Sequence, residues 1–366
     1  MQLGVVLVAL ALPALTSAPD GVGAQTQAPA GNSPWEPDRL LPGQGFWTRT
    51  IPLRADADGP VRATLVRRPL ERDRQHACAV LYIHGYVDYF LQPHLADYFA
   101  HAPMPAPMEP GCDFFALDLR RYGRSLDASE PYPNYAGNLD DYFEEIDAAL
   151  DVIGRDGYPF VLLNGHSTGA LTAVRYLQDG ARRAQVTAAF LNSPFLEFNA
   201  RDLSAVTRRL AGTLGWLFPH GNVRSSVPAW YARSLLQPSE CPDCHGHWTF
   251  SQALKPIEGF PVYFGWLRAV LRAQERARQG GITQPILVLH SARSNRGDGS
   301  VWRPEFGRAD LVLDVADIAR DGPKIGTRVT VTSIEGGLHD LTLSDPDAQA
   351  RTFDAVSAWL SGVRSK

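Results

Sequence analysis

The segment Phe160-Val-Leu-Leu-Asn-Gly-His-Ser-Thr-Gly-Ala-Leu171 determines the architecture of the chain. It begins with four apolar residues and ends at the start of a helical stretch over residues 170–177. Between them, Ser167 stands in Gly165-His166-Ser167-Thr168-Gly169, where an expected strand passes into an expected helix. A serine on so sharp a turn needs small neighbours, and Gly165 and Gly169 meet that need. The five-residue pattern is weak alone, so its position between a strand and a helix makes it informative.

Similar apolar runs recur along the chain and alternate with helical segments. The runs cover residues 79–83, 113–119, 160–163, 186–191, 285–289 and 328–334. Because they are apolar on both faces, they predict a parallel sheet covered by helices. The helices are expected over residues 89–101, 138–154, 170–177 and 347–363. Residues 46–53 and 61–68 alternate in polarity and predict an antiparallel hairpin, so the class is α/β with a mostly parallel, doubly wound sheet.

One interval, residues 195–281, interrupts this alternation. It is helical in pattern and rich in aromatic residues, and its longest expected helix spans residues 260–278. The aromatic residues could simply form the core of an inserted subdomain. They could also belong to a helical cap over the carboxyl edge of the sheet, with part of its apolar face lining a pocket. Both interpretations can hold together.

The N-terminal segment is a candidate for export. The run Leu3–Leu15 is apolar, and small residues end at Ala24, which is typical of a secretory signal over residues 1–24. The first basic residue is Arg39, so the usual basic start is missing, and the protein is cytoplasmic if this segment is not a signal. The run is also short for a stable membrane span. Residues 25–45 have linker composition, which leaves one large domain over residues 46–366.

Composition and charge narrow the class of protein. A hydrophobic fraction of 45% and a charged fraction of 20% are typical of a globular chain. The formal net charge of −4 gives no sign of a nucleic-acid partner. The oligomeric state is left open.

Four cysteines fit an exported chain. Cys78 and Cys112 each stand six positions before the end of a strand candidate, so they could meet if the two strands are parallel neighbours in register. Cys241 and Cys244, followed by His245, match a haem-attachment pattern, or a zinc site if His247 joins them. We favour a small loop disulfide or free thiols, because no electron-transfer signature and no second cysteine pair accompany them.

Ser167 is the expected nucleophile, and His339 is the best candidate for its base. His339 lies just after the last expected strand, in Gly336-Gly337-Leu338-His339-Asp340. In α/β sheets that carry a nucleophilic serine on such a strand–turn–helix, the nucleophile, the acid and the histidine follow one another in that order along the chain. The other histidines after Ser167 precede the preferred acid candidates; they are His220, His245, His247 and His290.

The acid member of the site has three candidates. The usual position soon after the penultimate strand holds Ser294 rather than a carboxylate. Asp298 lies in what looks like a flexible surface turn. Asp310 instead begins the apolar segment Asp310-Leu-Val-Leu-Asp-Val315, whose burial can anchor its loop. We therefore expect Asp310 rather than Asp298 to orient the base, and Asp314 is the third possibility.

Donors for a developing oxyanion are expected on two backbone turns. His84-Gly85-Tyr86 ends an earlier strand, and Gly85 lets the backbone approach a substrate oxygen. The Tyr86 and Thr168 backbone N–H groups are the expected oxyanion hole. The simpler interpretation is a plain turn with His84 hydrogen-bonded inside the fold.

Together these sequence segments resemble those of the α/β-hydrolase superfamily, and within it those of the serine aminopeptidase-like group that includes monoacylglycerol lipases and lysophospholipases. The matching segments are residues 82–86, 118–125, 165–169 and 336–340. The family usually has glycine where this chain has Arg121, and the loop before Asp310 is longer than usual. The resemblance covers residues from about Phe46 to the end and implies the α/β-hydrolase fold without specifying a substrate.

We therefore expect a serine hydrolase that cleaves small-molecule or lipid carboxylic esters through an acyl-enzyme, without a metal or an organic cofactor. The aromatic insertion favours an apolar acyl or alkyl group. A serine aminopeptidase or amidase is the alternative, and a non-catalytic binding module of the same fold is a further one.

Overall fold

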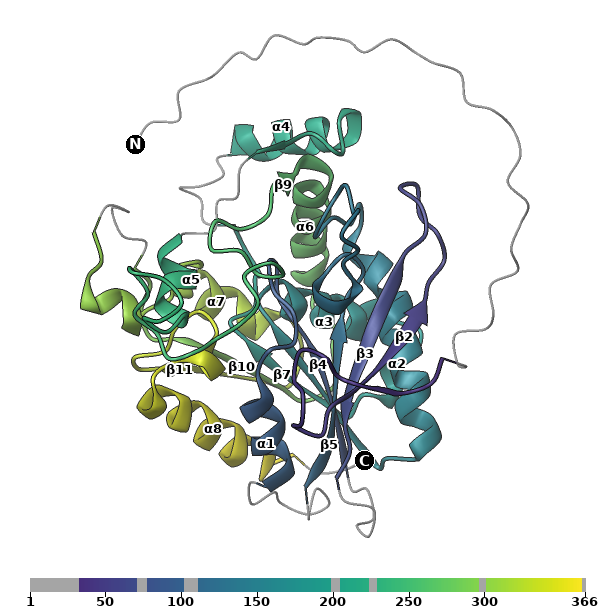
Figure 1. Ribbon diagram of the computed structural model, residues 1–366, viewed down its shortest axis with the longest axis vertical. Coiled ribbons are helices and arrows are strands. Elements are labelled where there is room, and N and C mark those ends of the chain that lie inside the picture. The colour runs from purple at the N-terminus through teal and green to yellow at the C-terminus, as the bar shows by residue number, and fades with distance from the viewer. Residues whose placement is uncertain are drawn as a thin grey trace.

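The computed structural model describes residues 33–70, 78–101, 111–198, 205–223, 229–295 and 301–363. The expected signal segment 1–24 and Asp298 lie outside these ranges. A nine-stranded sheet forms the centre, in the order β1-β2-β3-β5-β4-β6-β7-β10-β11 (Figure 1). Its strands are β1 Glu36–Pro37, β2 Trp47–Pro52, β3 Arg62–Arg68, β4 Cys78–Ile83, β5 Cys112–Asp118, β6 Phe160–His166, β7 Ala188–Asn192, β10 Ile286–Ser291 and β11 Val329–Ile334.

The sheet is mixed, as predicted. Strands β5, β4, β6, β7, β10 and β11 are parallel neighbours, whereas β1, β2 and β3 pair in antiparallel fashion at one edge. The antiparallel pair β3–β5 joins the two parts. β1 lies within the stretch that composition predicts as a linker, so ordered pairing begins before Phe46.

Helices cover both faces of the sheet, and alternate residues of each central strand pack toward opposite faces. In β4, Leu81 belongs to one buried cluster and Val80 to the other. The first cluster includes residues of α2 Phe143–Asp156, α3 Thr168–Asp179, α6 Phe264–Ala277 and α7 Val315–Asp321. The second includes residues of α1 Pro93–His101 and α8 Pro346–Leu360. The doubly wound prediction is confirmed, because strands buried on both faces need a helical layer on each side.

Three expected helices begin later than their patterns predict, and one of them is α6, which begins at Phe264 rather than at residue 260. Residues 89–92 are not helical, and α1 begins at Pro93, whose missing N–H costs nothing at the first helical position. The stretch that begins at Asn138 starts as a short 3-10 turn, Leu139–Tyr142, with the Asn138 side chain accepting from the Asp140 N–H. α2 then continues to Asp156 and ends where Gly157 takes a φ of 74°.

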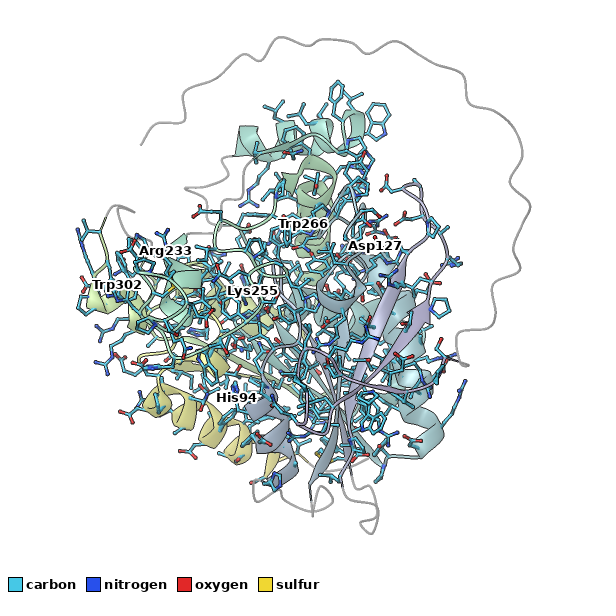
Figure 2. The ribbon with its side chains drawn as sticks, viewed as in Figure 1. His94, Asp127, Arg233, Lys255, Trp266 and Trp302 are labelled. Carbon is cyan, nitrogen blue, oxygen red and sulfur yellow. A yellow bond between two sulfur atoms is a disulfide. The ribbon has the colours of Figure 1, made fainter. Side chains whose placement is uncertain are left out.

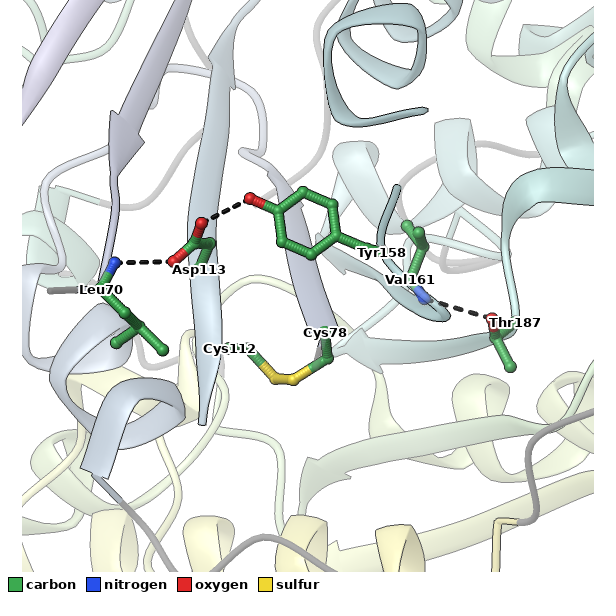
Figure 3. Close-up of a disulfide and its surroundings, with 7 residues drawn as sticks. All are labelled: Leu70, Cys78, Cys112, Asp113, Tyr158, Val161 and Thr187. Carbon is green, nitrogen blue, oxygen red and sulfur yellow. Dashed lines mark hydrogen bonds between the residues drawn. A yellow bond between two sulfur atoms is a disulfide. The ribbon is translucent and has the colours of Figure 1, made fainter. Parts of the chain in front are cut away.

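A disulfide joins the first residues of β4 and β5. Cys78 and Cys112 face each other in register, with their Cα atoms 4.6 Å apart (Figure 3). The pairing considered from the sequence is therefore confirmed. Beside it, the Asp113 carboxylate accepts hydrogen bonds from the Leu70 N–H and the Tyr158 hydroxyl. The crosslink lies at the amino ends of these strands, opposite the edge where Ser167 follows β6.

The interval between β7 and β10 contains helices, as its pattern predicts, but its residues 236–261 form no helix. It contains α4 Ala205–Leu217, β8 Asn222–Val223, α5 Ala229–Leu235, β9 Val262–Tyr263 and α6. In Figure 1, α4 lies across the end of α6 that is farther from the sheet. Among the described residues, no helix is both long and apolar enough to cross a membrane.

Cys241 and Cys244 form a second disulfide within this interval. The bond matches the favoured loop disulfide and leaves neither sulfur as a thiolate for haem attachment or zinc. The two neighbouring histidines have other contacts. His245 stacks on the Trp302 ring at 4.1 Å, and His247 Nε2 lies 3.2 Å from Asp345 Oδ1.

Candidate active site

Ser167 occupies the turn between β6 and α3 with a φ of 53° and a ψ of −117°. A non-glycine residue in this region is strained, so close packing must hold it. A Cβ at Gly165 would lie 2.6 Å from the Ala170 Cα, and one at Gly169 would overlap the carbonyl oxygen of His84. Glycine is therefore required at both positions, which is the local reason that the chain can present Ser167 here.

His339 and Asp310 lie next to Ser167 in a continuous chain of hydrogen bonds. His339 Nε2 is 2.9 Å from Ser167 Oγ, and His339 Nδ1 is 2.8 Å from Asp310 Oδ2. The other carboxylate oxygen of Asp310 accepts from the N–H groups of Val312 and Leu313 at 2.7 and 2.8 Å. All three side chains are buried, with Asp310 fully so. The arrangement can transfer a proton from the serine hydroxyl to an imidazole held by a carboxylate.

Asp310 reaches this place because its loop returns to the end of β10. The Asp310 N–H donates to the Arg293 carbonyl, and the Asn295 N–H donates to the Asp310 carbonyl, both at 2.8 Å. Asp310 therefore lies beside Ser294, the residue that holds the usual position of the acid. The Asp314 carboxylate instead accepts from the Ala316 N–H at the start of α7.

One expected oxyanion donor directly follows Ser167, and the other belongs to the turn that packs against it. Thr168 is the first residue of α3, where an N–H has no partner within the helix. The turn containing Tyr86 lies against the nucleophile, since a Cβ at Gly85 would be 3.1 Å from the Ser167 Cβ. Among the described residues, neither the Tyr86 nor the Thr168 N–H donates a hydrogen bond. Both are free to meet a substrate oxygen.

His84 is a structural residue of the turn, in line with the simpler interpretation. Its Nε2 accepts from the Leu119 N–H at 3.1 Å, and its Nδ1 lies 2.8 Å from the Gly85 carbonyl oxygen. Burial lowers the pKa of His84 despite nearby carboxylates. A neutral ring that accepts at Nε2 and donates from Nδ1 satisfies both contacts.

A second buried cluster lies beside this site, and sequence reasoning missed most of it. His166 Nδ1 is 3.3 Å from Asp88 Oδ2 and 3.9 Å from Asp340 Oδ2, and Lys255 Nζ is 2.6 Å from Asp88 Oδ1. Burial would raise the pKa of Asp88, but Lys255, His166 and His84 together outweigh burial and lower that pKa. Burial would lower the pKa of His166, but the Asp340 and Asp88 carboxylates raise it. Two sequence signals pointed here: His166 directly precedes Ser167, and Asp340 directly follows His339.

Asp88, His166 and Asp340 are also the described residues whose spacing could hold a metal ion. One ligand atom from each lies within 4.8 Å of the others. The Lys255 ammonium already provides a cation at Asp88. Asp340 accepts four further hydrogen bonds: from Gln92, Asn192 and, twice, Thr342. The two carboxylates are thus satisfied by the chain's own donors, whereas the buried His166 Nε2 has no hydrogen-bond partner among the described residues.

Comparison with known proteins was made at the level of sequence and of fold. The family described as serine aminopeptidase, S33 matches residues 74–296, a range that includes Ser167 and ends before Asp310. None of the curated protein sequences matches the chain.

Several solved structures share the fold. A monoacylglycerol lipase of Paleococcus ferrophilus is 17% identical, with a TM-score of 0.55 over 78% of this chain and 95% of the other. A soluble variant of monoglyceride lipase from Saccharomyces cerevisiae is 14% identical, with a TM-score of 0.57 over 87% and 97%. A carboxyl esterase from Bacillus coagulans is 15% identical, with a TM-score of 0.57 over 86% and 98%.

Proposed function

Since the chain belongs to the serine aminopeptidase S33 family of α/β-hydrolases, we propose that it is a serine hydrolase that cleaves carboxylic esters with an apolar acyl or alkyl group. The observation that carries this proposal is the hydrogen-bonded chain from Ser167 through His339 to Asp310. A buried carboxylate, an imidazole and a strained serine in this order form the arrangement that activates a hydroxyl for acyl transfer.

The reaction follows from these contacts. His339 Nε2 removes the proton of Ser167 as Oγ bonds to the ester carbonyl carbon, and the carbonyl oxygen takes the negative charge. The Tyr86 and Thr168 N–H groups donate to that oxygen. The proton on His339 then passes to the departing alcohol, which leaves an acyl group on Ser167. Water attacks this acyl-enzyme with His339 again as the base, releasing the acid and restoring Ser167.

The insertion over residues 195–281 supports an apolar substrate and acts in this proposal as a cap. The Tyr231 ring lies 5.4 Å from the His339 ring, and the Trp266 ring lies 4.1 Å from that of Tyr86. A peptidase that recognises a free α-amine needs an available carboxylate. Glu197 of the insertion is already paired with Arg208 and Arg278. The aromatic contacts favour an apolar ester group, and the pairing of Glu197 removes one carboxylate that could hold an α-amine.

A substrate panel tests the proposal. Purified protein is assayed with acyl esters, glycerides and aminoacyl anilides, and Ser167 is labelled with a fluorophosphonate. We expect ester hydrolysis and a Ser167 adduct, both absent in Ser167→Ala. Ser193→Ala is the matched control, because Ser193 is a buried serine that directly follows the neighbouring β7. Hydrolysis of anilides but not of esters would support the aminopeptidase alternative, and binding without turnover would support the non-catalytic one.

Export is proposed on separate grounds. Two disulfides, Cys78–Cys112 and Cys241–Cys244, are typical of proteins that fold outside the cytosol. N-terminal sequencing of protein recovered outside the cytoplasm should begin near Gln25. Recovery from the cytoplasm with Met1 retained would contradict this proposal.

A further inference from the structure

In the loop that follows β4, the β-branched residue Val87 has a strained backbone conformation. Val87 has a φ of 50° and is buried. A β-branched residue in this region is an outlier, and such a conformation persists only where surrounding contacts impose it. Val87 follows directly after Tyr86, whose N–H is a proposed oxyanion donor. The contacts that hold this loop therefore bear on where that donor lies.

The insertion makes three contacts with the loop over residues 86–89, one each to Tyr86, Asp88 and Tyr89. The Tyr86 hydroxyl donates to the Pro261 carbonyl at 2.7 Å. Lys255 Nζ donates to Asp88 Oδ1 at 2.6 Å. The Ser251 N–H donates to the Tyr89 hydroxyl at 2.9 Å. Residues 251–261 of the insertion thus hold the loop over residues 86–89.

Lys255 makes the one ionic contact of the three, and its placement is unusual for this chain. Of the 35 basic residues, three are lysines: Lys255, Lys324 and Lys366. Lys255 is 3% exposed, and its ammonium lies 5.4 and 5.9 Å from the ring centres of Phe250 and Tyr231. Figure 2 shows Lys255 near the centre of the molecule. A buried ammonium is costly unless it is paired, so the bond to Asp88 holds both partners in place.

Asp88 extends this contact to the nucleophile turn. Its second carboxylate oxygen lies 3.3 Å from His166 Nδ1, and His166 directly precedes Ser167. We propose that Lys255 is a positioning residue: by holding Asp88, it fixes the loop that carries the Tyr86 amide against the turn that carries Ser167. The inference rests on the proposed function and adds to it a role for the insertion in shaping the oxyanion site. Lys255 itself contacts no reacting atom.

The test replaces Lys255 with methionine, an unbranched side chain that is one atom shorter and carries no charge. Activity is measured per active site, counted by fluorophosphonate titration, so that unfolded protein does not contribute. We expect kcat for a short acyl ester to fall about 10–100-fold, because displaced oxyanion donors lose transition-state stabilisation, while KM stays within about threefold.

Lys324→Met is the matched control. It also removes a lysine that pairs with an aspartate, Asp321, but on the half-exposed surface beside α7. Its kcat should stay within about twofold of wild type, since surface ion pairs contribute little. If Lys255→Met has the wild-type kcat per titrated site, Lys255 contributes only to stability and the inference is wrong.

A double variant tests the route through Asp88. If Lys255 acts by holding that carboxylate, its effect should vanish once Asp88 is replaced. The double variant Lys255→Met with Asp88→Asn should therefore be no less active than the less active of the two single variants. Losses that multiply would mean that the two residues act separately, which contradicts the inference.

Amide hydrogen exchange gives a readout that does not need turnover. Residues 84–89 should exchange about tenfold faster in Lys255→Met than in Lys324→Met, because the loop opens locally once its ionic contact is lost. Equal exchange would overturn the positioning role. Wild-type protein that hydrolyses no ester would overturn the proposed function, while the exchange measurement would still decide whether Lys255 holds the loop.

Discussion

Replacement of Asp310 by asparagine changes one oxygen of the carboxylate into an amide NH₂ group. The oxygen that accepts from the Val312 and Leu313 N–H groups has two donors to satisfy, so the asparagine carbonyl oxygen should keep that position. The NH₂ group then lies where Oδ2 now stands, 2.8 Å from His339 Nδ1. His339 Nδ1 must accept a hydrogen bond, so its proton moves to Nε2 and faces Ser167.

A ring with its proton on Nε2 cannot take the proton of Ser167. Asp310→Asn should therefore lower kcat about 10⁴-fold, equivalent to about 5 kcal/mol of transition-state stabilisation, with the fold unchanged. The assay is kcat for a short acyl ester at saturation, measured per folded molecule by circular dichroism and protein concentration. The loss should be smaller at high pH, where hydroxide can assist.

Asp314→Asn is the matched control for this variant. Asp314 lies four residues away, and its side chain accepts from the Ala316 N–H at the start of α7, a role that asparagine fills equally well. Its kcat should equal that of wild type. An Asp310→Asn enzyme with more than about a tenth of wild-type kcat would refute the tautomer reasoning and remove Asp310 from the proposed mechanism.

Three further outcomes follow from the structure. Gly169→Ala should lower kcat at least about 100-fold and lower the thermal midpoint, because its Cβ would overlap the main chain that follows β4. Replacing Cys78 and Cys112 together by serine should cost about 3–4 kcal/mol in the free energy of unfolding, measured in urea, since the bond closes a 34-residue separation. Burial would lower the pKa of His166, but neighbouring carboxylates raise it above 6.5. Its charged form therefore stabilises the fold fully below about pH 6.5, and this contribution is lost as pH rises through the folded pKa. The difference in urea midpoint between wild type and His166→Gln should accordingly shrink from pH 6 to pH 9.

Local patterns in the sequence were sufficient for most of the fold. Strands buried on both faces appear as continuous apolar runs, and all six predicted runs are strands of the sheet. The turn at Ser167 was predictable because its glycines meet a steric need within five residues. Helix starts were less certain, since a turn such as residues 89–92 is held by a distant group: the Phe90 N–H donates to Asp118.

The sequence by itself determined Ser167 and His339 as the candidate nucleophile and base, through a local turn and through chain order. Only the tertiary structure brought Asp310 to His339, because a loop of uncertain path had to return to the end of β10. The pairing of Lys255 with Asp88 was equally beyond the sequence, since 167 positions separate the two residues. Local sterics act over a few residues and can be seen in a pattern, whereas buried charges find partners that only the packed fold brings together.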